Sequence, residues 1–208
     1  MKRYEISVRP MRELKHDVSR EVAAVFVDGY EKDLAFLSNN REKLVEAFQK
    51  MISPDVFFIA TLEDEIVGIL ACSNNKNRAL TIDKTILRNS FGYVKGSMAY
   101  HFMKDEFNKK LSYQDETGYI ECVATTVKAR SKGVSTALMR YVLANENYYR
   151  YILEVVDTNE VAYRLYKKLG FTEFERKKER FSKMKGFKHR IYMELCVYTR
   201  YKFGGPLQ

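Results

Sequence analysis

The sequence predicts a mixed α/β fold built on one twisted sheet of six or seven strands, with helices on both faces. Two strand-like runs in the second half of the chain are each followed by a segment with helical periodicity, an alternation typical of α/β domains. Two β-rich runs in the first half are joined by three charged residues, which is a hairpin signature. At 208 residues and 46% apolar content, the chain is long and apolar enough to bury one substantial core.

The N-terminal quarter of the chain predicts one strand and two helices. Residues 4–9 alternate as a strand, and residues 14–30 form an amphipathic helix whose apolar positions recur at helical spacing. Residues 32–52 predict a second helix, which Ser53-Pro54-Asp55 ends.

The next segments predict a hairpin and then an insertion. The runs 56–62 and 66–73 are the expected strands, and residues 63–65 form the turn. Residues 78–112 are the least legible part of the chain and predict a helical insertion with a flexible stretch at 92–96. At the C-terminal end, residues 172–182 and 187–198 predict a closing hairpin.

Residues 130–136 form a basic, glycine-containing turn between the strand-like run 119–124 and a helix-like segment. Apolar residues follow at helical spacing in this segment: Val134, Ala137, Leu138, Tyr141 and Val142. Such a turn offers free N–H groups, the positive end of the helix dipole and cationic side chains, which together suit a phosphate. The chain has no Walker loop and no Gly-x-Gly-x-x-Gly. By itself the turn is equally consistent with a basic cap on an ordinary surface helix.

A second motif, Asn159 to Phe171, follows the strand-like run 151–156. Asp157 and Glu160 have capping-box spacing, and Gly170 is suited to end the helix in a left-handed conformation, with Phe171 folding back onto Leu165 or Tyr166. The spacing of Asn159, Ala162 and Tyr166 places them on one face, whereas Leu165 and Leu169 belong to a neighbouring face that predicts core. A buried helix aromatic is the alternative reading of Tyr166.

The two motifs in this order resemble the acyl-CoA-binding core of the GNAT superfamily of N-acetyltransferases, over roughly residues 56–196 and most specifically at 119–138 and 151–171. The resemblance implies acetyl-CoA as cosubstrate, no metal, and pyrophosphate binding by the amides of the basic turn. It also implies that main-chain groups of residues 123–125 pair with pantetheine. The expected cofactor-binding residues are Val123, Ala124, Thr125, Arg130, Ser131, Lys132, Gly133, Val134, Ser135, Thr136, Asn159 and Ala162.

The same resemblance implies two catalytic residues. Glu121, on the strand before the turn, is the candidate base, and Tyr166 would protonate the thiolate leaving group. An edge carboxylate that is merely solvated or salt-bridged is the alternative for Glu121. The chain departs from the family pattern at Thr125, Val127 and Ser135, where the family often has Val, Pro and Gly or Ala.

Composition points to one domain, 1–208, in a reducing compartment. The N-terminus has no apolar leader region, and no stretch approaches eighteen apolar residues, so no membrane association is expected. Cys72, Cys122 and Cys196 are isolated and odd in number, which predicts buried thiols in a cytoplasmic protein. The three histidines are far apart, so no metal site is expected.

The net charge of +9 raises a nucleic-acid hypothesis, supported best by the basic run 176–190. A solvent-facing hairpin would look the same, so nucleic acid is not the favoured partner. A CoA-binding module without turnover is a further alternative. The favoured partner is a small-molecule or peptide amine acceptor, and the resemblance implies a pocket that includes residues such as Tyr30, Phe36, Glu121, Phe181 and Lys185. The aromatic tail 198–203 suggests docking on its own domain or a homodimer.

Overall fold

The computed structural model describes residues 5–180 and 182–197, which form two compact units. The first unit comprises the described residues up to Tyr113 together with Glu121–Glu146. The second comprises Gln114–Ile120 and the described residues from Asn147 onward. Strand β4 passes from the second unit into the first, because its first four residues belong to one and its last five to the other.

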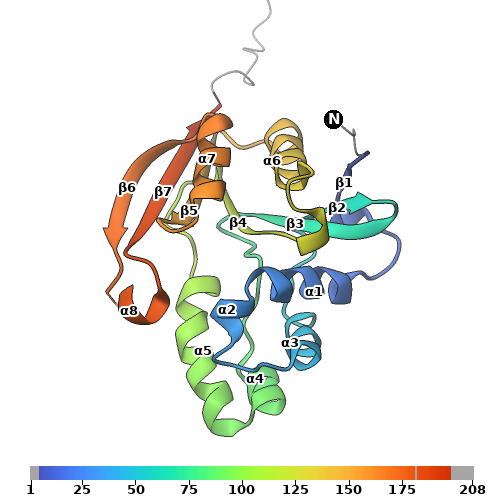
Figure 1. The fold of residues 1–208 in the computed structure, drawn as a ribbon, viewed down its shortest axis with the longest axis vertical. Coiled ribbons are helices and arrows are strands. Elements are labelled where there is room, and N and C mark those ends of the chain that lie inside the picture. The colour runs from blue at the N-terminus through green and yellow to red at the C-terminus, as the bar shows by residue number, and fades with distance from the viewer. Residues whose placement is uncertain (1–4, 181, 198–208) are drawn as a thin grey trace, which may run out of the picture. The chain divides into compact units, whose positions relative to one another are not determined.

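Seven strands are hydrogen-bonded in the order β1-β2-β3-β4-β5-β7-β6, which confirms the predicted mixed sheet (Figure 1). The pair β4·β5 is parallel, whereas β1·β2, β2·β3, β5·β7 and β6·β7 are antiparallel. The strands are β1 Ser7–Pro10, β2 Phe57–Leu62, β3 Glu65–Ser73, β4 Thr117–Thr125, β5 Arg150–Val156, β6 Thr172–Lys178 and β7 His189–Cys196. The first strand was predicted at 4–9, and residue 4 lies outside the described residues.

The predicted hairpin β2–β3 is confirmed, and its turn has an unusual backbone. Glu63 and Asp64 have φ angles of 49° and 62°, so both central residues are left-handed. A turn with two left-handed residues follows the right-handed twist of the flanking strands and closes a two-residue hairpin. The side chains of Phe57, Ile59 and Ile69 from these strands are buried in the core of the first unit.

The N-terminal helices differ from the prediction. The first, α1 (Ser19–Gly29), begins five residues later than expected, after a 3-10 turn at Met11–Glu13. The predicted single helix 32–52 is wrong: the chain forms α2 (Glu31–Leu34) and α3 (Arg41–Phe48) instead. Asn40 begins α3, because its side chain accepts a hydrogen bond from the Lys43 N–H at 3.1 Å. Asparagine at this position satisfies an otherwise unpaired N–H and so restarts a helix.

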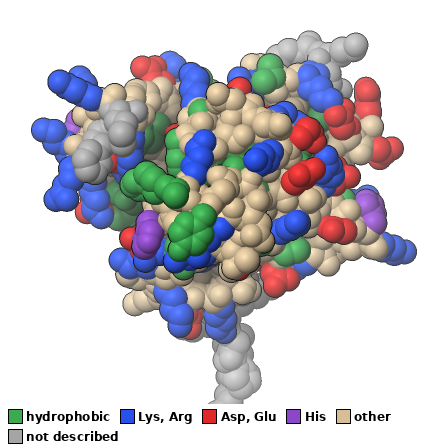
Figure 2. Space-filling model, turned by 90° about the horizontal axis from the view of Figure 1, so that it is seen from below, with side chains coloured by type: hydrophobic (Ala, Val, Ile, Leu, Met, Phe, Trp, Pro, Cys, Tyr) green, Lys and Arg blue, Asp and Glu red, His purple; other side chains and the backbone are tan. Residues whose placement is uncertain are grey.

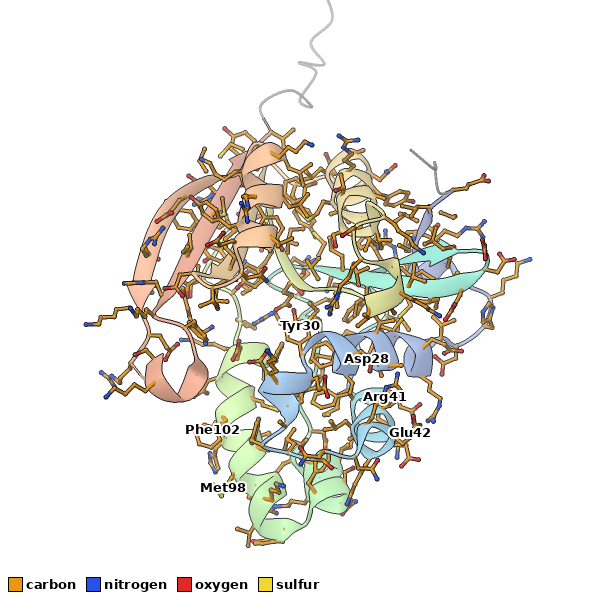
Figure 3. The ribbon with its side chains drawn as sticks, in the orientation of Figure 1. Asp28, Tyr30, Arg41, Glu42, Met98 and Phe102 are labelled. Carbon is orange, nitrogen blue, oxygen red and sulfur yellow. The ribbon has the colours of Figure 1, made fainter. Side chains whose placement is uncertain are left out.

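A two-point ion pair joins α1 to α3. The Arg41 guanidinium donates to both oxygens of Asp28, at 2.6 and 2.9 Å, and a third donor reaches Glu42 at 2.9 Å. Figure 3 shows these side chains meeting where the two helices pack. The same two helices are also joined by Phe26 of α1 and Phe48 of α3, whose rings contact each other at a tilt of 48° with centroids 5.2 Å apart.

The insertion is helical, as predicted, and consists of α4 (Lys84–Phe91) and α5 (Tyr93–Phe107). The stretch 92–96, predicted to be flexible, is a tight corner followed by the first turn of α5. Gly92 has a φ of 86°, which glycine adopts without steric penalty. A Cβ at Gly96 would lie 2.4 Å from the Leu87 carbonyl oxygen, so a glycine is needed for α5 to approach α4 this closely.

The second unit contains β5, the helix α7 (Glu160–Lys168), and the hairpin β6–β7 with the short helix α8 (Ser182–Lys185) between its strands. The predicted closing hairpin is confirmed, and β7 pairs with β5 on its other side. Its buried side chains include Tyr151, Leu153, Phe171 and Met193. Phe181 and the aromatic tail 198–203 lie outside the described residues.

Candidate functional site

The basic turn precedes α6 (Val134–Asn145) and leaves the start of that helix open. Gly133, with a φ of 87°, stands at the N-cap position, and no side chain of the described residues caps the helix. The first N–H groups of a helix have no partner within it, so those of α6 can donate to an anion, which the helix dipole also favours. A Cβ at Gly133 would meet nothing within 4 Å, so the backbone angle rather than space calls for glycine.

Two of the residues that depart from the family pattern contact each other. The hydroxyl oxygens of Thr125, the last residue of β4, and Ser135, in the first turn of α6, lie 3.0 Å apart and form a hydrogen bond. This bond ties the two ends of the basic turn together. The second half of β4 is held on its other side by β3, where the Thr126 N–H donates to the Val67 carbonyl at 2.9 Å.

Strand β4 has an irregularity in its middle. Its parallel register with β5 runs from Thr117↔Arg150 to Ile120↔Leu153, and Cys122 then adopts a left-handed φ of 54°. A left-handed residue inside a strand locally turns the backbone and redirects the peptide groups that follow. The groups predicted to pair with pantetheine, those of Val123 to Thr125, come directly after this point.

The carboxylate of Glu121 is held by several donors at once. The Arg78 guanidinium donates to both of its oxygens, from Nη2 at 2.9 Å and from Nε at 3.2 Å. The Ala79 N–H donates at 3.1 Å, and the Ser73 hydroxyl also donates to the same carboxylate. Both ionic side chains are nearly buried, 11% exposed for Arg78 and 10% for Glu121. Sequence reasoning missed Arg78 and Ser73, since neither belongs to a recognisable motif.

Arg78 also binds main-chain groups at the C-terminal end of α5, in the same unit. Its guanidinium also donates to the main-chain carbonyls of Glu106, at 2.9 Å, and Lys109, at 2.7 Å. The last carbonyls of a helix lack partners within it, and a cation there also opposes the negative end of the helix dipole. Arg78 therefore caps the C-terminus of α5 and holds Glu121 with one planar group.

Helix α7 begins and ends with well-defined caps. The Asn159 side chain accepts from the Ala162 N–H at 3.2 Å, so Asn159 and not Asp157 is the N-cap, which corrects the predicted capping box. At the other end Gly170, with a φ of 95°, is left-handed as predicted. The Phe171 N–H donates to the Tyr166 carbonyl at 3.0 Å, the bond that defines a Schellman end.

Tyr166 is the one buried side chain of α7, all of which the structure describes. Its ring packs against Phe171, with centroids 6.1 Å apart, which confirms that Phe171 folds back onto the helix. Leu165 and Leu169, predicted as core, are only half-buried. Burial raises the pKa of Tyr166 to about 12, so the phenol stays protonated at neutral pH and remains a proton donor.

Asp157 has a different role from the one predicted. Its carboxylate accepts from the Lys188 N–H at 3.1 Å and lies 3.2 Å from Nδ1 of His189, which joins the loop before α7 to the start of β7. Partial desolvation is outweighed by these hydrogen bonds, so the pKa of Asp157 lies below its ordinary value. Sequence reasoning did not identify this Asp–His pair, because its members are 32 positions apart.

Two of the cysteines lie near the candidate site residues in sequence and are unreactive. Cys72 and Cys122 are buried, and burial raises the pKa of both thiols well above the ordinary value. A thiol that stays protonated is a poor nucleophile, so neither side chain is suited to carry an acyl group. Cys196 is half-exposed, which differs from the prediction that all three are buried.

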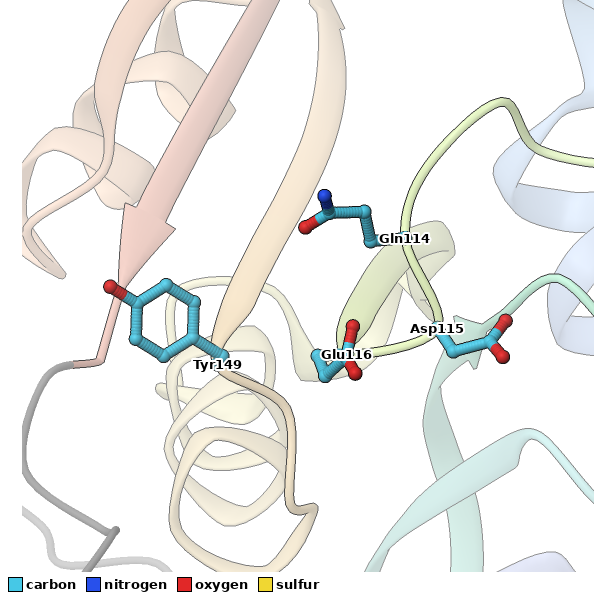
Figure 4. A pocket seen from close by; sticks show the side chains of 4 residues that line it. All are labelled: Gln114, Asp115, Glu116 and Tyr149. Carbon is cyan, nitrogen blue, oxygen red and sulfur yellow. The ribbon is translucent and has the colours of Figure 1, made fainter.

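A surface cavity of about 550 Å³ lies in the second unit, at the start of β4 and β5. It is lined by Gln114, Asp115, Glu116 and Tyr149, which Figure 4 shows, and these are not among the predicted site residues. Three of the four side chains are polar and exposed. None of the four lining residues belongs to the basic turn 130–136 or to the motif 159–171.

Four of the eight basic residues in the run 176–190 form ion pairs with carboxylates: Arg176, Lys177, Lys185 and Arg190. Arg176 bonds Glu173 at 2.7 Å, and Arg190 bonds Glu179 at 2.9 Å as well as Glu154. These pairs reduce the positive field that a nucleic acid would meet. In the part of the chain that the structure describes, no helix has the length and apolarity of a membrane span, and no group of three acidic, His or Cys side chains is arranged to hold a metal.

The predicted residues fall into two groups by compact unit. The first unit brings together the second half of β4, the basic turn and the start of α6. The second unit holds Asn159, Ala162 and Tyr166 on α7. The residues of the first group are Glu121, Val123, Ala124, Thr125, Arg130, Ser131, Lys132, Gly133, Val134, Ser135 and Thr136.

Comparisons with known proteins point to one family. Residues 26–171 match the model of the acetyltransferase (GNAT) family. Among solved structures, the chain is similar to PH1933 from Pyrococcus horikoshii, with a TM-score of 0.57 and 19% identity over 93% of this chain and 99% of that one. It is also similar to an N-acetyltransferase from Staphylococcus aureus, with a TM-score of 0.55 and 17% identity over 91% and 100% of the two chains.

A third similar structure is the ribosomal-protein-S18-alanine N-acetyltransferase from Escherichia coli. Its TM-score is 0.55 at 11% identity, over 93% of this chain and 94% of that one. At these identities the structural likeness establishes the fold. No curated protein gives a significant match to the sequence.

Proposed function

Because the chain belongs to the acetyltransferase (GNAT) family, we propose that it moves an acetyl group from acetyl-CoA to a primary amine. The observation that carries this proposal is the uncapped start of α6 behind the left-handed Gly133. Amides at a helix start bind a pyrophosphate, and the cationic Arg130 and Lys132 stand in the same turn. Val123, Ala124 and Thr125 would pair with pantetheine through their main-chain groups.

The proposed reaction is a direct attack of the amine on the thioester carbonyl. The new C–N bond forms as the C–S bond breaks, the amine loses a proton and the departing thiolate of CoA gains one. Direct transfer is supported by the state of Cys72 and Cys122, whose raised pKa values leave no thiolate to form an acyl-enzyme. Tyr166, held neutral by burial, is the proposed donor to the thiolate.

The attacking amine also needs a proton acceptor. Glu121 was predicted as the base from its place in β4, and this stays a prediction. Its carboxylate accepts hydrogen bonds from Arg78, Ser73 and the Ala79 N–H. These contacts fix the carboxylate in one place and also support a positioning role for Glu121.

The acceptor is proposed to be a small-molecule or peptide amine. The free, buried thiols of Cys72 and Cys122 fit a reducing compartment, and we place the protein in the cytoplasm on that ground. The half-buried Tyr30 and the exposed Phe36 at the two ends of α2 supply aromatic surface for an acceptor in the first unit.

Calorimetry with CoA and acetyl-CoA tests the cofactor, and an acetyl-transfer screen over small amines and peptide N-termini tests the reaction. We expect saturable binding of both CoA and acetyl-CoA, and release of CoA with at least one amine. Saturable binding without release by any amine, in a folded sample, would favour a CoA-binding module. Absence of binding at millimolar acetyl-CoA would contradict the assignment altogether.

A further inference from the structure

The two carboxylate oxygens of Glu121 are bound unequally. Among the residues that the structure describes, Oε1 accepts three hydrogen bonds, from the Ser73 hydroxyl, from the Ala79 N–H at 3.1 Å and from Arg78 Nε at 3.2 Å. Oε2 accepts one, from Arg78 Nη2 at 2.9 Å. A carboxylate oxygen offers about two lone-pair sites, so Oε1 is saturated and Oε2 can accept one further hydrogen bond.

The donors around this carboxylate are rigidly placed. Ser73 and Ala79 are both 0% exposed, and the planar guanidinium of Arg78 binds the two oxygens at once. The carboxylate cannot rotate about its last bond, or exchange its two oxygens, without breaking several hydrogen bonds. Oε2 is therefore fixed in one place relative to strand β4.

Glu121 lies next to the main-chain groups that are proposed to hold the cofactor. Cys122 follows it with a left-handed φ of 54°, and the groups of Val123 that are proposed to pair with pantetheine come next on the same strand. A carboxylate whose direction is set before the amine arrives spends no free energy on reorganising at the moment of reaction.

We propose that Arg78 is a positioning residue of the acetyl transfer. Together with Ser73 it occupies Oε1 of Glu121 and leaves Oε2 to accept a hydrogen bond from the acceptor amine. The assignment rests on the proposed function. It holds whether Oε2 takes the proton of the amine or only orients its N–H, since either role needs one acceptor oxygen at a fixed point.

A purely structural role of Arg78 would act through the end of helix α5 instead. Arg78 binds the carbonyls of Glu106 and Lys109, at 2.9 and 2.7 Å. Asn108 anchors the same end separately, because its side chain accepts from the Ile82 N–H at 2.7 Å and donates to the Ile82 carbonyl at 2.9 Å. Asn108→Ala therefore loosens the end of α5 while leaving the carboxylate network intact, and it is the matched control.

The contacts at the end of α5 matter for stability, because one face of this helix is uncovered. Val94, Met98 and Phe102 are 71%, 55% and 67% exposed, and Figure 3 shows Met98 and Phe102 on the same side of the helix. Figure 2 shows the molecule from below, with hydrophobic side chains at the surface beside a histidine and with Lys and Arg around them. The place of α5 thus depends on its inner face and its end, and both the Asn108 and the Arg78 variants should lower stability.

The test measures the kinetics of the full-length chain with an amine found in the transfer screen, at saturating acetyl-CoA. Arg78→Lys keeps the charge but loses the planar fork, and Arg78→Met loses both. Arg78→Lys should lower kcat/KM for the amine about tenfold or more, and Arg78→Met should lower it further, because a small displacement of a positioned group costs a large factor in rate. The dissociation constant of CoA should not change. Asn108→Ala should keep the wild-type kcat/KM.

A double variant separates positioning of Glu121 from stabilisation of the fold. Arg78→Met/Glu121→Leu should regain much of the stability that Arg78→Met loses but none of its kcat/KM, since the positioned carboxylate is gone. Recovery of kcat/KM together with stability would overturn the proposal. Wild-type kcat/KM in Arg78→Lys, or an equal loss in Asn108→Ala, would also overturn it.

Ser73→Ala keeps the proposal testable if the Arg78 variants do not fold. It removes one donor from Oε1 and should lower kcat/KM for the amine about threefold or more at unchanged CoA affinity, whereas an unchanged kcat/KM would overturn the proposal. A wild type that transfers acetyl to no amine contradicts the proposed function and this proposal with it. An active wild type whose turnover is insensitive to Arg78 and Ser73 contradicts this proposal alone.

Discussion

The hydroxyl groups of Thr125 and Ser135 are hydrogen-bonded across the basic turn, 3.0 Å apart. Each residue by itself departs from the pattern of the family, and no motif in the sequence indicates that the two meet. Together they replace small or apolar residues by a polar link between the last residue of β4 and the first turn of α6. The turn that is proposed to bind pyrophosphate is therefore closed by side chains as well as by backbone.

Removing one of the two hydroxyl groups should lower the free energy of unfolding more than removing both. Thr125→Val leaves the half-buried Ser135 hydroxyl without its partner and should lower the free energy of unfolding by about 1 kcal/mol. Thr125→Val/Ser135→Ala should recover part of that loss. Urea unfolding of the wild type, both single variants and the double variant measures the coupling; strictly additive effects would mean that the bond does not stabilise the turn.

Gly133→Ala should weaken both stability and cofactor binding. An alanine at a φ of 87° costs about 1 kcal/mol or more, and relief of that strain would close the turn over the N–H groups of α6. Gly133→Asn should lose less stability and less CoA affinity than Gly133→Ala, because asparagine tolerates the left-handed region. Calorimetric titration with CoA reports binding; equal affinity in the wild type and the alanine variant would separate this turn from the cofactor.

Tyr166→Phe should lower kcat by about a hundredfold or more and leave the dissociation constant of CoA nearly unchanged. The reason is that the phenol is proposed to donate a proton only as the thiolate departs. Tyr163→Phe, on the same helix and half-buried, is the control and should keep its turnover. Full kcat in Tyr166→Phe at saturating substrates would remove this residue from the mechanism.

The raised pKa of Tyr166 also predicts an alkaline loss of stability. In the unfolded chain the phenol ionises near about pH 10, whereas burial keeps it neutral to about 12 in the folded protein. Between these values the unfolded state releases a proton that the folded state retains, so the free energy of unfolding falls as pH rises through this window. Below it the contribution is constant.

Unfolding free energies measured between about pH 9 and 11.5 test this, with Tyr166→Phe as the comparison. The variant should show a shallower decline than the wild type. Equal slopes in the two proteins would mean that Tyr166 ionises in the folded chain as it does in solution.

Arg78→Met should destabilise the protein by about 3 kcal/mol or more, because it leaves the nearly buried Glu121 carboxylate without its cation. Arg78→Met/Glu121→Leu should recover much of this loss. Glu121→Gln separates the two proposed roles of the carboxylate. A base gives a shifted acidic limb in the pH–rate profile, whereas a positioning residue gives an unchanged limb and lower stability.

The sequence-based predictions were most accurate for features that depend only on residues adjacent in the chain. Gly170 and Phe171 end α7 as predicted, and the turn at Glu63-Asp64 closes the expected hairpin, because both depend on the conformations open to a few neighbouring residues. Asn40 is a local signal as well. It was overlooked because helical periodicity continues on both sides of it, which merged two helices into one prediction.

The parts that could not be predicted depend on residues distant in sequence. Glu121 meets Arg78 across 43 positions, and the Asp157–His189 pair spans 32. No sequence motif marks pairs at these separations, because the contacts form only when the strands and the insertion pack together. The exposure of one apolar face of α5 could not be predicted either, because the identity of an apolar residue does not tell whether its side chain is buried.

The Arg78 guanidinium connects two elements of the first unit, the end of α5 and strand β4. Arg78 binds the Glu106 carbonyl in the last turn of α5, the Lys109 carbonyl just beyond that helix and the Glu121 carboxylate of β4 at the same time, so a displacement of the helix end also acts on the carboxylate. Linked binding equilibria are reciprocal: if a ligand bound at β4 shifts the end of α5, a ligand bound at α5 changes the affinity at β4 by the same factor.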